Sequence, residues 1–199
     1  MNKRTIIILF IIFISNTNIF ASDALIVYFS RVGISQSFSS VDAVSSASLP
    51  DGNTIVLMKM IQDITNADSY QIITEKTYPA EYSDTTDLAK IEQRKNERPL
   101  LKNSISNLGR YETIFLGYPN WWGTFPMAVF TFLESYDLSN KTIIPFCTHE
   151  GSSFGRSLRD LKRIYPQVEI LEGFSVRGSS VKDAQKDVEK WLRGLGFTN

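Results

Sequence analysis

The stretch TIFLGYPNWWGTFPMAVFTFLES, residues 113–135, contains the signals of a strand, a loop and a helix in immediate succession. Residues 113–117 form a short apolar run of β-branched and aromatic side chains, which is typical of a buried strand. Residues 126–135 begin with proline, which favours the first turn of a helix, and space their large apolar side chains onto one face. The stretch therefore predicts a buried strand, a loop at residues 118–124 and an amphipathic helix.

The same alternation of strand and helix continues on both sides of this stretch. Apolar runs predict further strands at residues 24–29, 142–147 and 168–171, and a less buried one at residues 69–74. Apolar periodicity predicts helices at residues 84–96, 157–164 and 181–195. Because the apolar runs are continuous rather than alternating, they favour a parallel sheet that is covered on both faces. Five strands that alternate with helices predict one open, doubly wound α/β sheet with helices on both faces.

Residues 53–65 fit either a strand or a helix. The apolar residues near the start of this segment could begin a strand, but that would leave no crossover helix before the strand at residues 69–74. The helical interpretation gives one apolar face, an N-cap at Asn53 or Thr54, and Asn66 near the C-terminus. We therefore predict a helix at residues 53–65.

The beginning of the chain has the layout of a secretory signal peptide. Two basic residues precede an apolar run at residues 5–14, and a polar stretch then leads to Ala21, a small residue suited to cleavage. A membrane anchor is the alternative, but the run has about half of the ~20 apolar residues needed to cross a bilayer. We expect a signal peptide at residues 1–21 and a periplasmic or secreted mature protein of one domain at residues 22–199. Contact with a membrane is then expected only through an uncleaved signal peptide.

The composition excludes several classes of function. The 199 residues contain 21 Lys and Arg against 21 Asp and Glu, so the net charge gives no electrostatic footprint for nucleic acid. One His and one Cys are too few for a structural zinc or iron–sulfur site, and we predict no metal site. The single cysteine, Cys147, also excludes an intrachain disulfide, and its position at the end of a buried strand predicts a thiol in the core.

Polar and aromatic residues follow three of the predicted strands at their carboxyl ends, where ligands bind in open α/β sheets. Residues 30–31, resumed by residues 52–54 at the start of a helix, offer hydroxyls, an amide and N–H groups that suit a phosphate. Residues 118–124 offer a flat apolar wall through two adjacent tryptophans. Residues 148–155 are rich in small side chains, which let a planar ligand approach the backbone closely. A phosphate site beside an aromatic plane describes flavin mononucleotide (FMN).

These segments resemble the flavodoxin family over nearly the whole expected mature chain. The matching stretches are LIVYFSR (25–31), GNT (52–54), YPNWWGTFPM (118–127), DLSNKTIIPFCTHEGSSFGRS (137–157) and VEKWLRGLG (188–196). YFSR or GNT alone is a weak signal, but the order of the stretches and their strand-to-helix positions make the resemblance specific. The resemblance implies a flavodoxin-like five-stranded parallel sheet of order 2-1-3-4-5, with FMN as the ligand.

The resemblance also implies which residues contact FMN. Phosphate contacts fall on Ser30, Asn53 and Thr54. Ring contacts fall on Pro119, Asn120, Trp121, Trp122 and Gly123, and on Thr148, His149, Glu150 and Gly151. Arg31, beside the phosphate site, is a further candidate ligand, and a surface salt bridge is the alternative role for it.

The sequence departs from the family pattern between the first strand and the first helix. Most flavodoxins run directly from the strand serine into a short Thr-Gly-Asn-Thr loop, whereas residues 32–51 separate Arg31 from Gly52 here. We interpret residues 32–51 as an insert that splits the phosphate loop and forms a lid over the phosphate. In the alternative, an unsplit loop, Val32 and Ser35 would have to contact the phosphate.

Simpler roles stay open for several candidate residues. Asn53 and Thr54 also fit a role as helix caps alone, and His149 fits a role in shaping its loop rather than in proton transfer. One of the two tryptophans is expected to pack inward, and Trp122 is favoured as the neighbour of the flavin ring.

The sequence thus predicts an exported flavodoxin-like protein that binds FMN and carries out electron transfer or flavin-dependent reduction. Its expected partners are FMN and either a redox protein or a small acceptor. An FMN-dependent NAD(P)H:quinone-type reductase is one alternative, and a cofactor-free binding module on the same fold is another. No G-x-G-x-x-G nicotinamide fingerprint occurs in the sequence, which favours the electron carrier.

Overall fold

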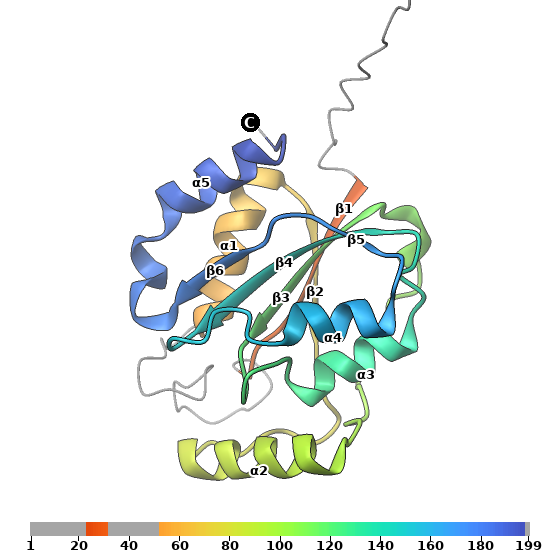
Figure 1. Cartoon of the computed structure of the whole chain (residues 1–199), viewed down its shortest axis with the longest axis vertical. Coiled ribbons are helices and arrows are strands. Elements are labelled where there is room, and N and C mark those ends of the chain that lie inside the picture. Colours follow the sequence, from red (N-terminus) through yellow and green to blue (C-terminus); the bar gives the residue numbers. More distant parts are fainter. Residues whose placement is uncertain (1–22, 32–51, 198–199) are drawn as a thin grey trace, which may run out of the picture.

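Strand β1 (Ala24–Phe29) runs through the interior of a parallel sheet, and all six of its residues are buried. The computed structural model describes residues 23–31 and 52–197, and Figure 1 shows the sheet between layers of helices. The expected signal peptide at residues 1–21 and the expected lid at residues 32–51 lie outside the described residues.

The strands of the sheet follow the predicted order, β2-β1-β3-β4-β5. Besides β1, they are β2 (Asp68–Ile72), β3 (Thr113–Pro119), β4 (Thr142–His149), β5 (Glu169–Ile170) and β6 (Phe174–Arg177). Every strand pair is parallel. β3 is buried along its whole length, as a central strand covered on both faces must be. The predicted open parallel α/β sheet is therefore confirmed.

The strand predicted at residues 168–171 is β5, and β6 continues the same sheet edge as a strand that was not predicted, so the described residues form six strands rather than five. β5 pairs with β4 as far as Ile170 opposite Ile143, and β6 resumes the pairing at Phe174 opposite Phe146. Pro145 of β4 lies in the gap, and proline has no N–H to donate to a neighbouring strand. Between these paired positions the outer chain advances four residues while β4 advances three, so the outer chain bulges past the proline.

Helices cover the two faces of the sheet in pairs. Figure 1 shows α1 (Asn53–Thr65) and α5 (Gln185–Gly194) on one side, and α3 (Met127–Ser135) and α4 (Ser157–Ile164) on the other. Helix α2 (Tyr82–Lys95) packs beside α3. Alternate residues of β1 divide the core accordingly: Ile26 packs with the α1 and α5 side chains, and Val27 with those of α3 and α4. The alternation follows from the two-residue period of a strand.

The helix predicted at residues 53–65 is α1, but its N-terminal cap differs from the prediction. Gly52 precedes the helix with φ 77°, a left-handed conformation that glycine adopts without strain. Asn53 and Thr54, predicted as caps, are instead the first two helical residues. Asn66 ends the helix in a left-handed conformation, as its position suggested.

Two other helices also differ from prediction at their ends. α2 begins two residues before the predicted Asp84, because Glu81 ahead of it is extended and turns the chain into the helix at Tyr82. The helix predicted at residues 181–195 is divided into a 3₁₀ helix, η3 (Gly178–Asp183), and α5. A further 3₁₀ turn, η2 (Leu108–Arg110), leads into β3. None of the helices in the described part of the chain has the length and apolar character needed to cross a membrane.

Candidate cofactor site

The start of α1 and the end of β4 meet through two hydroxyl groups. Thr54 Oγ1 lies 3.0 Å from Thr148 Oγ1, and both residues are fully buried. Thr54 belongs to the first turn of α1, and Thr148 is the penultimate residue of β4. The sequence assigned these residues to separate segments of one site, and the fold brings them into contact.

The first turn of α1 presents hydrogen-bond donors at the carboxyl edge of the sheet. The helical hydrogen bonds begin with Val56 N–H donating to the Gly52 carbonyl, and the N–H groups of the first turn point along the helix axis toward its N-terminal end. Ser30, at the end of β1, and Asn53 are both fully buried. Donors at a helix N-terminus and the helix dipole together favour an anion.

Arg31, just after β1, forms hydrogen bonds with the segment that leads into α2. It is 3% exposed, and its Nη1 donates to the carbonyls of Pro79 at 2.5 Å and Ala80 at 3.0 Å. These contacts bind the guanidinium to the chain ahead of α2, and the choice between a phosphate ligand and a salt bridge for Arg31 stays a prediction.

The loop after β3 is fixed by the side chain of Asn120. Its Oδ1 accepts from Gly123 N–H at 2.9 Å, and its Nδ2 donates to the Ser153 carbonyl at 2.7 Å. Trp122 and Gly123 adopt left-handed conformations with φ 52° and 84°. Asn120 therefore holds a tight turn and joins this loop to the loop after β4.

The two adjacent tryptophans of this loop point in different directions. Trp121 is 2% exposed and packs edge-on against Phe29 and Tyr78, with ring centroids 5.4 and 5.1 Å away. Trp122 is 43% exposed, and its indole Nε1 donates to the Thr86 carbonyl of α2 at 3.1 Å. Trp121 is therefore the member of the pair that packs inward. Its side chain was predicted to contact the flavin ring, but it packs in the core instead.

His149 shapes the loop after β4. Its Nδ1 accepts from Gly151 N–H at 2.8 Å, which leaves the proton of a neutral imidazole on Nε2. Burial lowers the pKa of His149, the nearby Arg177 lowers it further, and Glu150 acts in the opposite direction. Burial and Arg177 both favour the neutral imidazole, and the contact of its Nδ1 with Gly151 N–H is structural.

Two glycines permit the close approach of the chains around the site. A Cβ on Gly178 would lie 2.1 Å from Asn53 Nδ2 and 2.5 Å from Glu150 Oε1, so η3 begins against both predicted segments. A Cβ on Gly155 would lie 2.3 Å from the Gly123 carbonyl oxygen. Gly178 was not predicted to belong to the site, because its role appears only when η3 packs against α1.

A cleft of about 480 Å³ opens where these segments meet. Six predicted residues line it: Asn120, Trp122, Gly123, His149, Glu150 and Gly151. Tyr82 and Ser152 also line the cleft and were not among the predicted contacts. Tyr82 begins α2, which follows β2, so it belongs to the same sheet edge and that position could have indicated it.

The other predicted contact residues lie outside the lining of the cleft. Ser30, Arg31, Asn53, Thr54, Pro119, Trp121 and Thr148 are all buried. Cys147, next to Thr148, is a core thiol as predicted, and burial raises its pKa. Within the described ranges no group of three or more His, Cys, Asp and Glu side chains is arranged to hold a metal ion.

Comparison with known proteins places this geometry in a family. The model of the family described as Flavodoxin matches residues 41–195. A search of proteins with curated descriptions gave no match.

Solved structures share the fold. Proteins from Bacteroides eggerthii and Bacteroides uniformis, both provisionally named flavoproteins, are each 27% identical to this chain with a TM-score of 0.67. The alignments cover 87% and 86% of this chain and 98% of each of those chains. A flavoprotein from Lactobacillus acidophilus, solved in complex with FMN, is 19% identical with a TM-score of 0.58 and shares the fold over 83% of this chain and 99% of its own. The family model matches well over half of this chain, and the chain therefore belongs to the flavodoxin family.

Proposed function

We propose that this protein binds FMN at the carboxyl edge of its sheet and serves as an electron carrier outside the cytoplasm. The observation that carries the proposal is the contact between Thr54 and Thr148, at 3.0 Å, beside a cleft with an exposed tryptophan. Family membership and the FMN bound by the Lactobacillus acidophilus protein support the choice of cofactor.

The start of α1 fits the phosphate of FMN. Hydroxyls of Ser30, Thr54 and Thr148 are buried at the same sheet edge as the N-terminus of α1. Such a site holds a phosphate through neutral donors and the helix dipole. Arg31 contributes by fixing the neighbouring chain, since its guanidinium already donates to two backbone carbonyls.

The cleft fits the flavin ring. Trp122 and Tyr82, both about two-fifths exposed, supply aromatic surface to it. A planar ring with polar edges also needs backbone donors and acceptors, which the small residues of the loop at 148–155 can present. The volume of about 480 Å³ lies within the usual range for small-molecule sites.

FMN supplies the redox chemistry when it is bound, and the chain supplies binding and electrostatics. The neutral His149 is held by Gly151 N–H, which favours a role in orienting the loop over one in proton transfer. No nicotinamide fingerprint accompanies the site. These features favour electron transfer between partners over a nicotinamide-dependent quinone reductase.

Export rests on the first 21 residues, whose basic start, apolar run and Ala21 have the layout of a signal peptide. The electron donor and acceptor would then be proteins or small molecules of the same compartment.

The absorption spectrum of the purified full chain tests the proposal. We expect a yellow protein that releases FMN, and neither riboflavin nor FAD, when it is denatured. Reduction by dithionite should be reversible, and NADH or NADPH with a quinone should give no turnover. A colourless protein that takes up no FMN would instead indicate a cofactor-free binding module, and rapid quinone turnover with a nicotinamide would indicate a reductase.

A further inference from the structure

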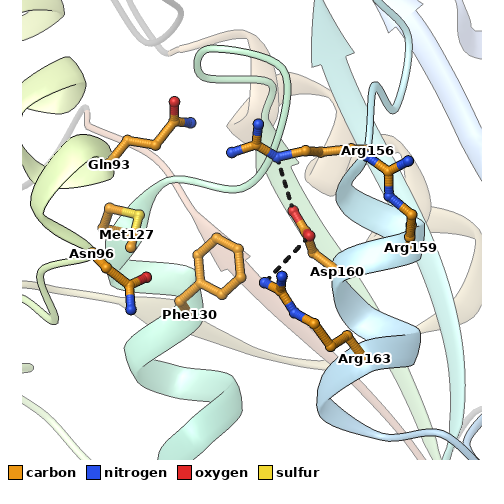
Figure 2. A pocket seen from close by; sticks show the side chains of 8 residues that line it. All are labelled: Gln93, Asn96, Met127, Phe130, Arg156, Arg159, Asp160 and Arg163. Carbon is orange, nitrogen blue, oxygen red and sulfur yellow. Dashed lines mark hydrogen bonds and ion pairs between the residues drawn. The ribbon is translucent and has the colours of Figure 1, made fainter.

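A second groove lies between α2, α3 and α4 and shares no lining residue with the cofactor cleft. Its volume is about 290 Å³. Figure 2 shows Gln93 of α2 and Asn96, which directly follows that helix, on one side of it, and the arginines of α4 and its N-terminal end on the other. Met127 and Phe130 of α3 line it between the two walls, and both are almost fully buried. We call this the arginine groove.

The α4 wall of the arginine groove is strongly cationic. It carries Arg159 and Arg163, which lie one helical turn apart on α4, and Arg156, which directly precedes the helix. Asp160 is the single acid that lines the groove, so the lining carries three positive charges against one negative charge. The whole chain has balanced charge, and the groove is therefore a local concentration of positive charge.

Asp160 holds two of these arginines in place. It is 5% exposed, its Oδ2 accepts from Thr124 Oγ1 at 2.6 Å and from Arg156 Nε at 3.3 Å, and its Oδ1 lies 3.4 Å from Arg163 Nη2. Each guanidinium has five N–H donors, so a single contact with Asp160 leaves most of them for other acceptors. Arg159 has no ion pair among the described residues.

The opposite wall adds polar groups without adding charge. Gln93 Nε2 donates to the Trp122 carbonyl at 3.3 Å, and Arg98 Nη1 donates to Asn96 Oδ1 at 3.0 Å. Both amide side chains are thus oriented by contacts outside the groove. An acceptor between the walls would meet guanidinium donors from α4 and amide groups from α2.

From this arrangement we propose that the arginine groove binds a small organic or inorganic anion of charge −2 or more, held through carboxylate or phosphate oxygens. The lining carries a net charge of +2, which matches a dianion. Guanidinium groups form planar, bidentate hydrogen bonds with both carboxylates and phosphates. A recess of about 290 Å³ with a wall on each side suits a small molecule. A flat acidic protein surface would meet the exposed arginines but not the amides on the far side.

Isothermal titration of the FMN-loaded full chain with citrate and with inorganic phosphate, at constant ionic strength, tests the proposal. We expect saturable binding of one equivalent of at least one of the two anions. Arg159→Gln and Arg163→Gln should each weaken it about threefold, and the double variant roughly tenfold. The matched control is Arg193→Gln, an exposed arginine on α5 at the other face of the sheet, which should leave binding unchanged.

Arg159→Gln breaks no ion pair of the described residues, so it tests the groove even if Arg163→Gln proves unstable. The flavin absorbance of every variant is recorded in the same samples, which separates a failure of the groove from a failure of FMN binding. Absence of saturable binding by both anions overturns the proposal, and so does an equal loss in Arg193→Gln. Binding of a hexaglutamate peptide without binding of either small anion also overturns it, and assigns the groove to an acidic protein.

Discussion

Lys90 lies over the indole ring of Trp122, with its Nζ 4.8 Å from the ring centroid. The same indole donates from Nε1 to the Thr86 carbonyl, so α2 fixes the orientation of the tryptophan through two contacts one helical turn apart. Trp122 lines the cofactor cleft, and Lys90 is not among the described residues that line it. A flavin ring in the cleft would meet a tryptophan already held in place.

We expect Trp122→Ala to weaken FMN binding and to restore flavin emission. Offset stacking contributes about 0.5–1.5 kcal/mol beyond area burial, which corresponds to a roughly twofold to tenfold rise in Kd. A stacked indole also quenches flavin fluorescence, and the alanine removes it. Fluorescence titration of apo-protein with FMN measures both effects. Unchanged affinity with emission still quenched would show that the ring lies against the loop at 148–155 instead.

Trp121→Ala should act on stability. Its ring is buried among Phe29 and Tyr78, and deletion of a large aromatic side chain from a core costs roughly 3–5 kcal/mol of unfolding free energy. Trp121→Phe should retain most of that stability, because the buried Nε1 has no hydrogen-bond partner among the described residues. Urea unfolding of both variants measures the difference. Equal losses in the two would contradict the assignment of Trp121 to an apolar contact.

Thr54→Ala should weaken FMN more than riboflavin. The two flavins differ by the phosphate, and Thr54 belongs to the first turn of α1. Loss of one hydrogen bond to a charged group costs roughly 1.5–3 kcal/mol. Titration of both flavins into apo-protein gives the comparison.

Thr65→Ala is the matched control for Thr54→Ala. Thr65 is a buried threonine at the opposite end of the same helix, where its Oγ1 donates to the Ile61 carbonyl at 2.8 Å. This variant should leave the ratio of the two affinities unchanged. If Thr54→Ala lowers both affinities equally, Thr54 only supports the fold.

Glu92 should make the protein less stable as the pH rises from about 4.5 to about 7. Burial raises its pKa from an ordinary value of 4.5 to about 7, although the hydrogen bond from Tyr78 OH, at 2.9 Å, lowers it. In that pH range the folded chain keeps a proton that the unfolded chain has lost, so unfolding free energy falls with rising pH. Glu92→Gln should remove this part of the fall, while Glu112→Gln on the surface should not. Urea unfolding at several pH values gives the unfolding free energy as a function of pH. An identical pH dependence for wild type and Glu92→Gln would contradict the prediction.

The mature protein should begin near Ser22. The basic start, short apolar run and Ala21 have the layout of a cleaved signal peptide. Mass spectrometry of the exported protein reads the N-terminus directly. An intact Met1 in a membrane fraction would indicate an anchor.

The continuous apolar runs predicted the sheet correctly, because a strand covered on both faces is buried at every position, as residues 113–119 are. Strand β6 was missed, although Pro145, as a residue without an N–H, could have signalled the break in pairing before it. The N-cap of α1 was misplaced because Asn and Thr are common caps, whereas Gly52 takes that position through its positive φ. Local sequence therefore predicted the type of each helix and strand better than the residues at which it begins and ends.

The candidate site divides in a similar way. The loops after β3 and β4 were found from their position at strand ends, and seven of their residues line the cleft, six of them predicted contacts. Trp121 and Trp122 point in different directions because the chain makes a left-handed turn at Trp122 and Gly123. Two adjacent tryptophans do not indicate in the sequence which of them points inward. Tyr82 could have been indicated by its position after β2, whereas Gly178 reaches the site only through the packing of η3.

Titration of apo-protein with FMN, followed by flavin fluorescence, decides whether this chain binds the cofactor of its family. We expect saturation at one equivalent, strong quenching of the bound flavin, and weaker binding of riboflavin because it lacks the phosphate. Flavin emission that stays linear with added FMN, with no quenching at any concentration, would show that the family fold is used here without its cofactor.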